Sequence, residues 1–211
     1  MQLSRTDIND LDRRKRANLI NSVTGIKPAN LIGTKSDQGV ENLAIFSSVL
    51  HLGSNPPLIA MVTRPLGEVP RHTYENIQAK GVYTINAVPV YKTEQAHYTS
   101  AKFDHDESEF ETCSFEPVYV EGFDAPFVKE SPIRFGLKLV QEIPVQLNGT
   151  VMLIGEIQHL FIQDELISDE GYINLEKAGV AGISGLNTYY DLSLKASYPY
   201  ARKEDFFKET S

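Results

Sequence analysis

The side chains of this chain that are best suited to binding a ligand lie between Asn42 and Thr73. Ser47, Ser48 and Thr73 supply hydroxyl groups, Asn42 supplies an amide, and Arg64 supplies a guanidinium. Anions bind where hydroxyls and backbone N–H groups converge, and the start of a helix adds a partial positive charge. A guanidinium can hold a phosphate through two parallel hydrogen bonds. These residue types therefore favour a ligand that carries a phosphate and a polar ring system.

Each of these residues also has a purely structural interpretation. Ser47 and Ser48 would then hydrogen-bond across a sheet, and Thr73 would only cap a helix. Arg64 would form a surface ion pair, and Asn42 would belong to a turn. The spacing of the residues leaves both interpretations open.

The elements that must position these side chains follow from the hydrophobic pattern. Residues 42–48 follow an Asp-Gln-Gly turn and form a strand that ends at the two serines. The apolar run at residues 57–63 predicts a second strand, which delivers Arg64. Residues 73–80 predict a helix, with Thr73 as its N-cap and Gly81 at its C-terminal end.

The rest of the chain adds more strands than helices. We expect further strands at residues 29–34, 82–87, 115–119, 133–139 and 151–162, a helix at 91–100, a turn at 122–126 and a loop at 179–185. Strict alternation in residues 133–139 is typical of a half-buried antiparallel strand, and Gly155 predicts a bend. Consecutive strands without regular β-α-β alternation favour an antiparallel barrel with inserted helices.

The domain organisation is simple. Residues 1–22 form a polar N-terminal extension with a short docking helix, residues 23–200 form a single domain, and residues 201–211 form a charged tail.

Composition narrows the classes of function. The net charge of −8 over 211 residues argues against nucleic acid and anionic membranes as partners. The single cysteine, Cys113, excludes an intrachain disulfide, and no signal peptide or membrane-spanning run is present, so we expect a cytoplasmic protein. The spacing of the five histidines does not predict a metal site, and no constellation of catalytic residues stands out.

A series of short motifs carries a family resemblance. In order, they are Asp37-Gln38-Gly39, Asn42-Leu43-Ala44 with Ser47, Asn55-Pro56-Pro57-Leu58, His72-Thr73 with Asn76-Ile77, Gly81-Val82-Tyr83-Thr84-Ile85-Asn86, Ser100-Ala101-Lys102-Phe103, Glu109-Phe110 and Gly155-Glu156-Ile157. Together they resemble the flavin reductase-like family, the FMN-binding split β-barrel proteins that include flavoredoxin. The resemblance covers roughly residues 28–190 and implies a mainly β, antiparallel split barrel with Greek-key connections.

The resemblance also implies a cofactor and the residues that bind it. It implies a homodimer with FMN near the subunit interface, with FAD or riboflavin as alternatives. Asn42, Leu43, Ala44 and Ile45 would line the isoalloxazine ring, and Ser47, Ser48, Arg64, His72 and Thr73 would hold the phosphate and ribityl chain. Ser100, Lys102 and Phe103 would approach the flavin from another side.

The implied activity is that of an NAD(P)H-dependent flavin reductase, which transfers hydride from NADH or NADPH to flavin. The cofactor carries such chemistry, so no side chain is required as an acid or base. Two alternatives stay open: a non-enzymatic FMN electron carrier, and a barrel that binds another small ligand without redox function.

Overall fold

The computed structural model describes residues 1–67 and 69–203. Its strands are β1 (Lys27–Pro28), β2 (Asn30–Lys35), β3 (Glu41–Phe46), β4 (Val49–Ser54), β5 (Pro57–Thr63), β6 (Val82–Ala87), β7 (Pro117–Val120), β8 (Phe123–Val128), β9 (Ile133–Val145), β10 (Thr150–Ile162), β11 (Ala181–Ser184) and β12 (Thr188–Asp191). Its helices are α1 (Arg5–Asp10), α2 (Arg13–Ser22), α3 (His72–Lys80), α4 (Thr93–Tyr98), α5 (Glu109–Thr112) and α6 (Leu175–Ala178), with 3₁₀ turns η1 (Val90–Lys92) and η2 (Asp164–Leu166).

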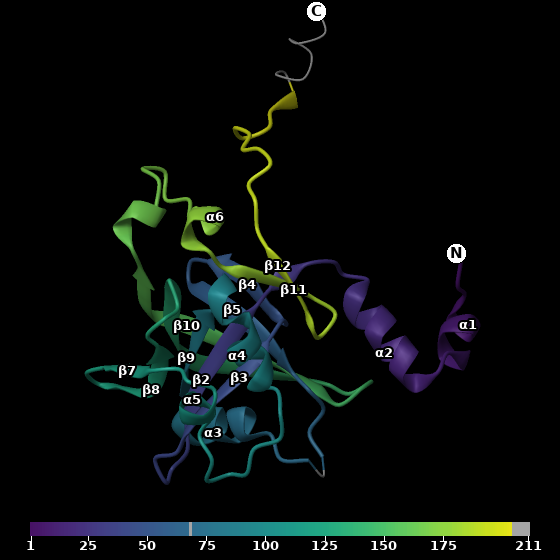
Figure 1. Ribbon diagram of the computed structural model, residues 1–211, viewed down its shortest axis with the longest axis horizontal. Helices are drawn as coiled ribbons and strands as arrows, with labels where there is room; N and C mark the ends of the chain where they lie inside the picture. Colours follow the sequence, from purple (N-terminus) through teal and green to yellow (C-terminus); the bar gives the residue numbers. More distant parts are fainter. Residues whose placement is uncertain (68, 204–211) are drawn as a thin grey trace, which may run out of the picture.

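Seven antiparallel strands form the central sheet, in the order β3-β2-β6-β9-β10-β5-β4 (Figure 1). β3 and β4 are the two end strands of this order, yet only Ser47 and Ser48 separate them in sequence. The Cα atoms of Phe46 and Val49 are three residue steps apart and so at most about 11 Å from each other, which means that the two ends of the sheet must lie close together here. The sheet therefore curls into a barrel with a seam between β3 and β4. This confirms the prediction of a mainly β, antiparallel barrel with inserted helices.

Two smaller sheets flank the barrel. One has the order β1-β11-β12, and the other is the β7–β8 hairpin. α3 packs on β2 and β3, and α5 packs on β3. The helices that interrupt the strand order thus gather at the β3 end of the sheet, beside the seam.

Local sequence explains the connections around the seam. Gly39 adopts φ +87° in the β2–β3 turn, a backbone conformation that costs glycine little. Gly81 adopts φ +69° at the C-terminal end of α3, as predicted for its cap. A register shift between β9 and β10 at Ile154 and Gly155 produces the predicted bend.

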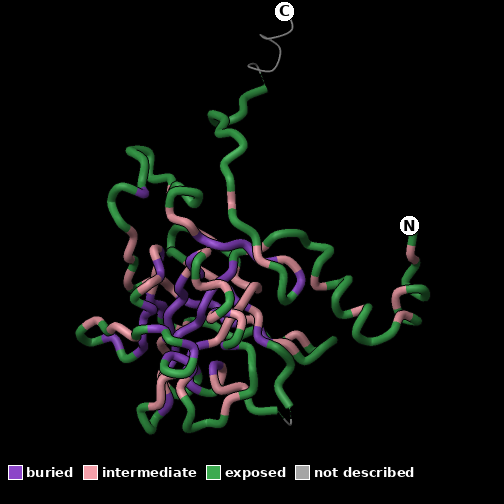
Figure 2. Tube along the Cα trace, in the orientation of Figure 1, coloured by how far each residue is buried: buried purple, intermediate pink, exposed green. Residues whose placement is uncertain are grey.

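Three buried clusters make up the core (Figure 2). The barrel interior contains Ile32, Met61, Ile77, Tyr83, Ile85, Leu137, Val151 and Leu153. A second cluster, outside the barrel, joins β2, β3, α4, α5 and β11 through Leu31, Leu43, Ala96, Phe110 and Ile183. The third lies under the β7–β8 hairpin at Phe123, Ala125 and Phe127. Leu31 and Ile32 face different clusters, as alternation along a strand requires.

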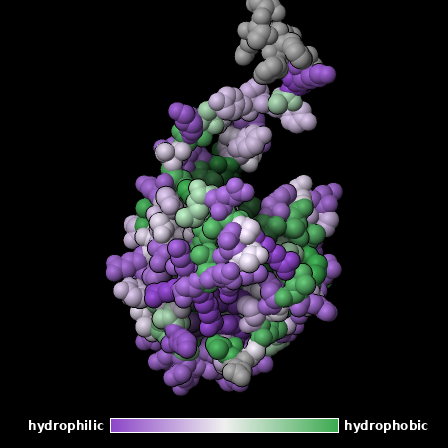
Figure 3. Space-filling view, turned by 90° about the vertical axis from the view of Figure 1, so that its right-hand side faces the viewer, coloured by the Kyte–Doolittle hydropathy of each residue, from purple (hydrophilic) through white to green (hydrophobic). Residues whose placement is uncertain are grey.

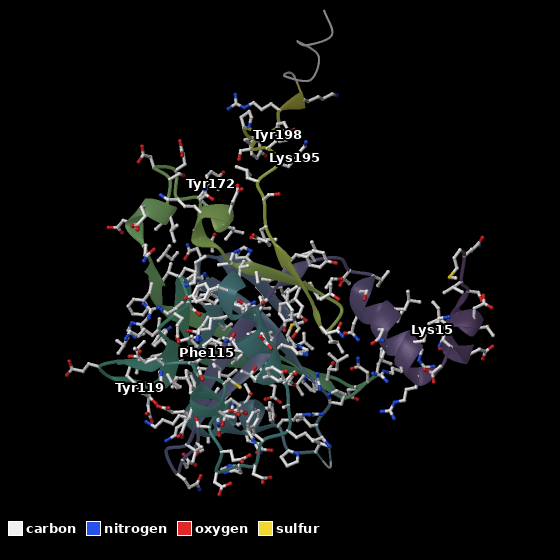
Figure 4. The ribbon with its side chains drawn as sticks, in the orientation of Figure 1. Lys15, Phe115, Tyr119, Tyr172, Lys195 and Tyr198 are labelled. Carbon is white, nitrogen blue, oxygen red and sulfur yellow. The ribbon has the colours of Figure 1, made fainter. Side chains whose placement is uncertain are left out.

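Both ends of the chain leave this core. α1 and α2 contain no buried residue and project from the barrel, and so does the segment that follows β12 (Figures 1 and 2). Lys15 on α2 and Tyr198 on the C-terminal segment both lie far from the barrel (Figure 4). No helix among residues 1–67 and 69–203 is long and apolar enough to cross a membrane.

Three sequence predictions were wrong in part, and β4 was not predicted. Residues 179–185, predicted as a loop, contain β11. The turn predicted at 122–126 is shorter, because β8 begins at Phe123. Thr73 is not the N-cap of α3, which begins at His72 after Arg71. The charged tail lies outside the described residues from 204 onward.

Candidate functional site

The seam between β3 and β4 brings the predicted site residues together. The Ser48 hydroxyl donates to the carbonyl oxygen of Val62 at 2.7 Å, and the Val62 amide donates to the Ser48 carbonyl oxygen at 3.1 Å. These bonds tie the end of β3 to β5, so Arg64, two residues beyond Val62, emerges at the same place. The hydroxyl proton of Ser48 is used within the protein. Ser47, half-buried at the seam, makes no side-chain hydrogen bond to a described residue.

A buried polar network lies on the inner side of β3. The Asn42 amide nitrogen donates to the hydroxyl oxygens of Thr34 at 3.2 Å and Thr73 at 3.1 Å. The Asn76 amide nitrogen also donates to the Thr34 hydroxyl, at 3.1 Å. All four residues are buried. Thr73 therefore locks α3 onto β3, while its own hydroxyl proton has no acceptor among the described residues.

The cationic groups of the predicted site lie on the outside. Arg64 and Lys102 are exposed, and neither forms an ion pair with a carboxylate of the described residues. His72, half-buried at the start of α3, stacks edge-on against His105, with ring centroids 5.2 Å apart. This contact brings the segment after α4 to the start of α3.

That segment is also bonded to β3. The amide of Ile45 donates to the Thr99 hydroxyl oxygen at 2.9 Å, and the amide of Leu43 donates to the Glu109 carboxylate at 2.9 Å. Ser100, Lys102 and Phe103 lie between Thr99 and His105, so they are held between β3 and the start of α3. The Ser100 hydroxyl donates back to the carbonyl oxygen of His97.

Thr99 and Glu109 were not among the predicted site residues. Glu109 was noted only as part of a family motif, and Thr99 directly precedes another. The sequence offered one signal for Glu109, which directly precedes Phe110 in an otherwise charged segment. If Phe110 is buried, the neighbouring carboxylate is drawn into the protein, and a buried carboxylate requires a hydrogen-bond partner.

Burial sets the electrostatics of Glu109. Burial of the Glu109 side chain raises the pKa of its carboxyl, and the nearby charge of Glu107 adds to the rise. The Leu43 amide opposes the rise because it donates to the ionised form. The pKa of the Glu109 carboxyl therefore lies above the usual value of a glutamate side chain.

The backbone of β3 completes the site. β3 ends the sheet order, so alternate backbone groups face away from β2. The outward amides of Leu43 and Ile45 donate hydrogen bonds to Glu109 and Thr99, respectively. The carbonyl oxygens of Leu43 and Ile45 accept no hydrogen bond from a described side chain or loop amide. Free carbonyl oxygens can accept a ring N–H, and exposed cations can hold a phosphate. These groups suit a ligand that carries a phosphate and a polar ring system.

Known proteins share this architecture. A profile described as flavin reductase like domain matches residues 26–178. An uncharacterised protein of Halalkalibacterium halodurans is 30% identical over 168 residues, which cover 77% of this chain and 80% of that protein.

Solved structures agree with the sequence relatives. A crystal structure from Shewanella frigidimarina NCIMB 400, described as a candidate flavin reductase with a split barrel domain, is 49% identical, with a TM-score of 0.91 and coverage of 95% of this chain and 100% of that one. Flavoredoxin of Desulfovibrio vulgaris (Miyazaki F) has the same fold, with 24% identity, a TM-score of 0.71 and coverage of 83% and 92%. This chain belongs to the flavin reductase-like family and has the split-barrel fold.

Proposed function

We propose that this protein is an FMN-binding oxidoreductase that transfers hydride from NADH or NADPH to flavin. The observation that carries the proposal is the seam itself. There, the Ser47 hydroxyl and the carbonyl oxygens of Leu43 and Ile45 accept no hydrogen bond from a described side chain or loop amide, and Arg64 and Lys102 form no ion pair with a described carboxylate, in a member of the flavin reductase-like family. An anionic ligand would supply a charge partner for Arg64 and Lys102.

The phosphate would be held by Arg64, Lys102 and the Ser47 hydroxyl. His72 lies at the start of α3, where the partial positive charge of the helix favours an anion. Thr73 keeps one hydroxyl proton to donate. Ser48 is less suited to a phosphate, because its proton already goes to Val62.

The isoalloxazine ring would lie along β3, from Asn42 to Ile45. The carbonyl oxygens of Leu43 and Ile45 can accept the one N–H of the oxidised ring, and Ala44 lies between them. Phe103 and Ser100 approach from the segment after α4. The Asn42 amide nitrogen is committed to Thr34 and Thr73, so it shapes this strand from behind.

Bound FMN would supply the hydride-accepting ring, as flavins do in oxidoreductases. The chain then needs to bind the flavin, orient it at the seam and leave one face open to the nicotinamide. No side chain of the seam needs to transfer a proton.

One anaerobic experiment tests the proposal. The purified protein is titrated with FMN, and its absorbance is recorded before and after addition of NADH and, separately, NADPH. We expect the reduced nicotinamide to bleach the bound flavin. When air is then admitted, the flavin should reoxidise, and the protein should consume NADH or NADPH over many turnovers. Flavin that bleaches only with a reduced partner protein would show an electron carrier instead. A protein that binds no flavin would overturn the proposal.

We also propose a homodimer, which the two projecting ends support. α1 and α2 are six and ten residues long, too short to be stable as isolated helices. Ile20, Val23 and Ile26 are exposed around them. The side of the molecule on which these helices lie shows apolar groups among polar ones (Figure 3). Sedimentation at micromolar concentration should give twice the chain mass of 23.6 kDa, and a monomer would contradict the proposal.

A further inference from the structure

One side of β3 has no neighbouring strand, because β3 is the last strand of the sheet order. Exposed edges of this kind normally need a cover. Here two side chains take the place of a strand. Thr99 and Glu109 accept the outward amides of Ile45 and Leu43, each at 2.9 Å. The two acceptors lie ten positions apart in sequence, whereas the two amides lie two residues apart on β3.

Each acceptor is itself fixed. The Thr99 hydroxyl donates to the carbonyl oxygen of Ala96 at 2.8 Å, which ties it to the end of α4. Glu109 begins α5, and the next residue, Phe110, lies fully in the core. Thr99 and Glu109 are buried, with 3% and 5% of their surfaces exposed. The two ends of the intervening segment are thus rigidly placed.

Residues 100–108 between them are held much less firmly. They form no helix or strand, and all except Phe103 and Ser108 are exposed. Phe103 packs on the buried cluster around Leu43 and Phe110. It also lines a cavity of about 250 Å³ between α4 and α5, together with Gln95, Tyr98 and Cys113 among others. The packing of the segment is therefore incomplete, and the bonds at Thr99 and Glu109 add to it in holding the segment against β3.

We propose that Thr99 and Glu109 are positioning residues that clamp residues 100–108 across the open edge of β3. The clamp fixes the position of Lys102 and Phe103 relative to β3. It also occupies two amides, so a ligand on this edge can use only the carbonyl oxygens of Leu43 and Ile45. The part of this inference that concerns flavin rests on the proposed function, whereas the clamp itself does not.

The clamp can be tested without flavin by amide hydrogen exchange at Leu43 and Ile45 in the wild type and in Glu109→Ala and Thr99→Ala. We expect each alanine variant to lose about tenfold protection at its own amide. Glu109→Gln and Thr99→Ser keep an acceptor oxygen and should retain protection. Glu111→Gln, on the exposed face of the same short helix, is the matched control. Unchanged exchange in both alanine variants would overturn the clamp.

The same variants are then titrated with FMN by fluorescence quenching. The alanine variants should bind about tenfold more weakly, and Glu109→Gln, Thr99→Ser and Glu111→Gln should bind like the wild type. Faster exchange with unchanged FMN affinity would overturn the positioning role. If Glu109→Ala does not fold, Thr99→Ala against Thr99→Ser decides the question. A wild type that binds no flavin would refute the proposed function, while the exchange data still decide the clamp.

Discussion

The polar residues around β3 fall into two sets that differ in what they bond to. The inner set, Thr34, Asn42, Thr73 and Asn76, is buried and hydrogen-bonded within itself. The outer set, Ser47, Arg64 and Lys102, has no side-chain hydrogen bond or ion pair to the described residues. Both sets contain residues that the sequence placed at one ligand site. The structure separates those that are hydrogen-bonded within the protein from those that have no such bond to a described residue.

The difference has a physical basis. A buried amide or hydroxyl must find a partner inside the protein, because leaving it unpaired costs stability. An exposed cation is hydrated, so it costs little free energy when it has no partner in the protein. Its N–H groups therefore remain available to a ligand. Variants of the inner set should therefore affect folding first, and variants of the outer set should affect flavin binding alone.

The largest effect is expected for Asn42→Ala in the inner set. The variant leaves the Thr34 and Thr73 hydroxyls without one donor and opens a small void between β3 and α3. We expect a loss of about 2–4 kcal/mol in the free energy of unfolding. Urea denaturation measures it, and Asn18→Ala, an exposed residue of α2, is the control. A loss no greater than that of the control would mean that the inner network contributes nothing to stability.

The second effect concerns the outer set. Arg64→Ala removes one charge-assisted contact to the phosphate, so FMN should bind about 10- to 100-fold more weakly. Stability should stay within about 0.5 kcal/mol of the wild type, because the side chain is exposed. Arg14→Ala, which removes an exposed arginine from α2, should change neither. Equal FMN affinity in both variants would remove Arg64 from the phosphate site.

Much of the fold was predictable because its strands alternate or are uniformly apolar. β2, β5, β6, β9 and β10 were predicted for this reason. β4 was not, because it is an end strand with no buried residue, so burial leaves no pattern in its sequence. β11 was missed because residues 179–185 are rich in glycine, which suggested a loop; Gly182 lies within the strand. A side chain at Gly182 would instead meet Ile26 and Leu192, so close packing accounts for this glycine.

The residue types of the candidate site could be predicted from the sequence, but the hydrogen-bond partners of these residues could not. Asn42 and Thr73 are 31 positions apart, and Leu43 and Glu109 are 66 apart. Sequence patterns report periodicity over a few residues and say nothing of contacts at such separations. The roles of Asn42 and Thr73 within a buried network, and of Glu109 as an acceptor for β3, therefore became visible only in the structure.

Glu109 combines a property of each set, because it is buried and hydrogen-bonded like the inner set and ionisable like Arg64 and Lys102 of the outer set. Burial raises its pKa, so the folded protein keeps this proton to a higher pH than the unfolded chain does. The free energy of unfolding must then fall as pH rises from the unfolded value of about 4.3 through the folded pKa. Glu109→Gln removes this titration and keeps an acceptor for the Leu43 amide.

We therefore expect the stability of Glu109→Gln, relative to the wild type, to increase with pH across that window. Urea denaturation at a series of pH values measures the difference, and Glu111→Gln, which replaces an exposed carboxylate of the same short helix, is the control. A relative stability of Glu109→Gln that decreases as pH rises would mean that the Leu43 amide lowers the pKa of Glu109 more than burial raises it.

The smallest effect is expected at Tyr83, the exception within the barrel interior. Its side chain is fully buried, and its hydroxyl has no hydrogen-bond partner among the described residues. Burial raises the pKa of this hydroxyl, so it stays neutral. Tyr83→Phe removes the unpaired group and should leave the free energy of unfolding unchanged or raise it by up to about 1 kcal/mol. Tyr119→Phe, which loses a 2.6 Å bond to Glu41, should lower it slightly. A loss at Tyr83 larger than at Tyr119 would mean that the Tyr83 hydroxyl has a partner, so Tyr83 would no longer be an exception in the barrel interior.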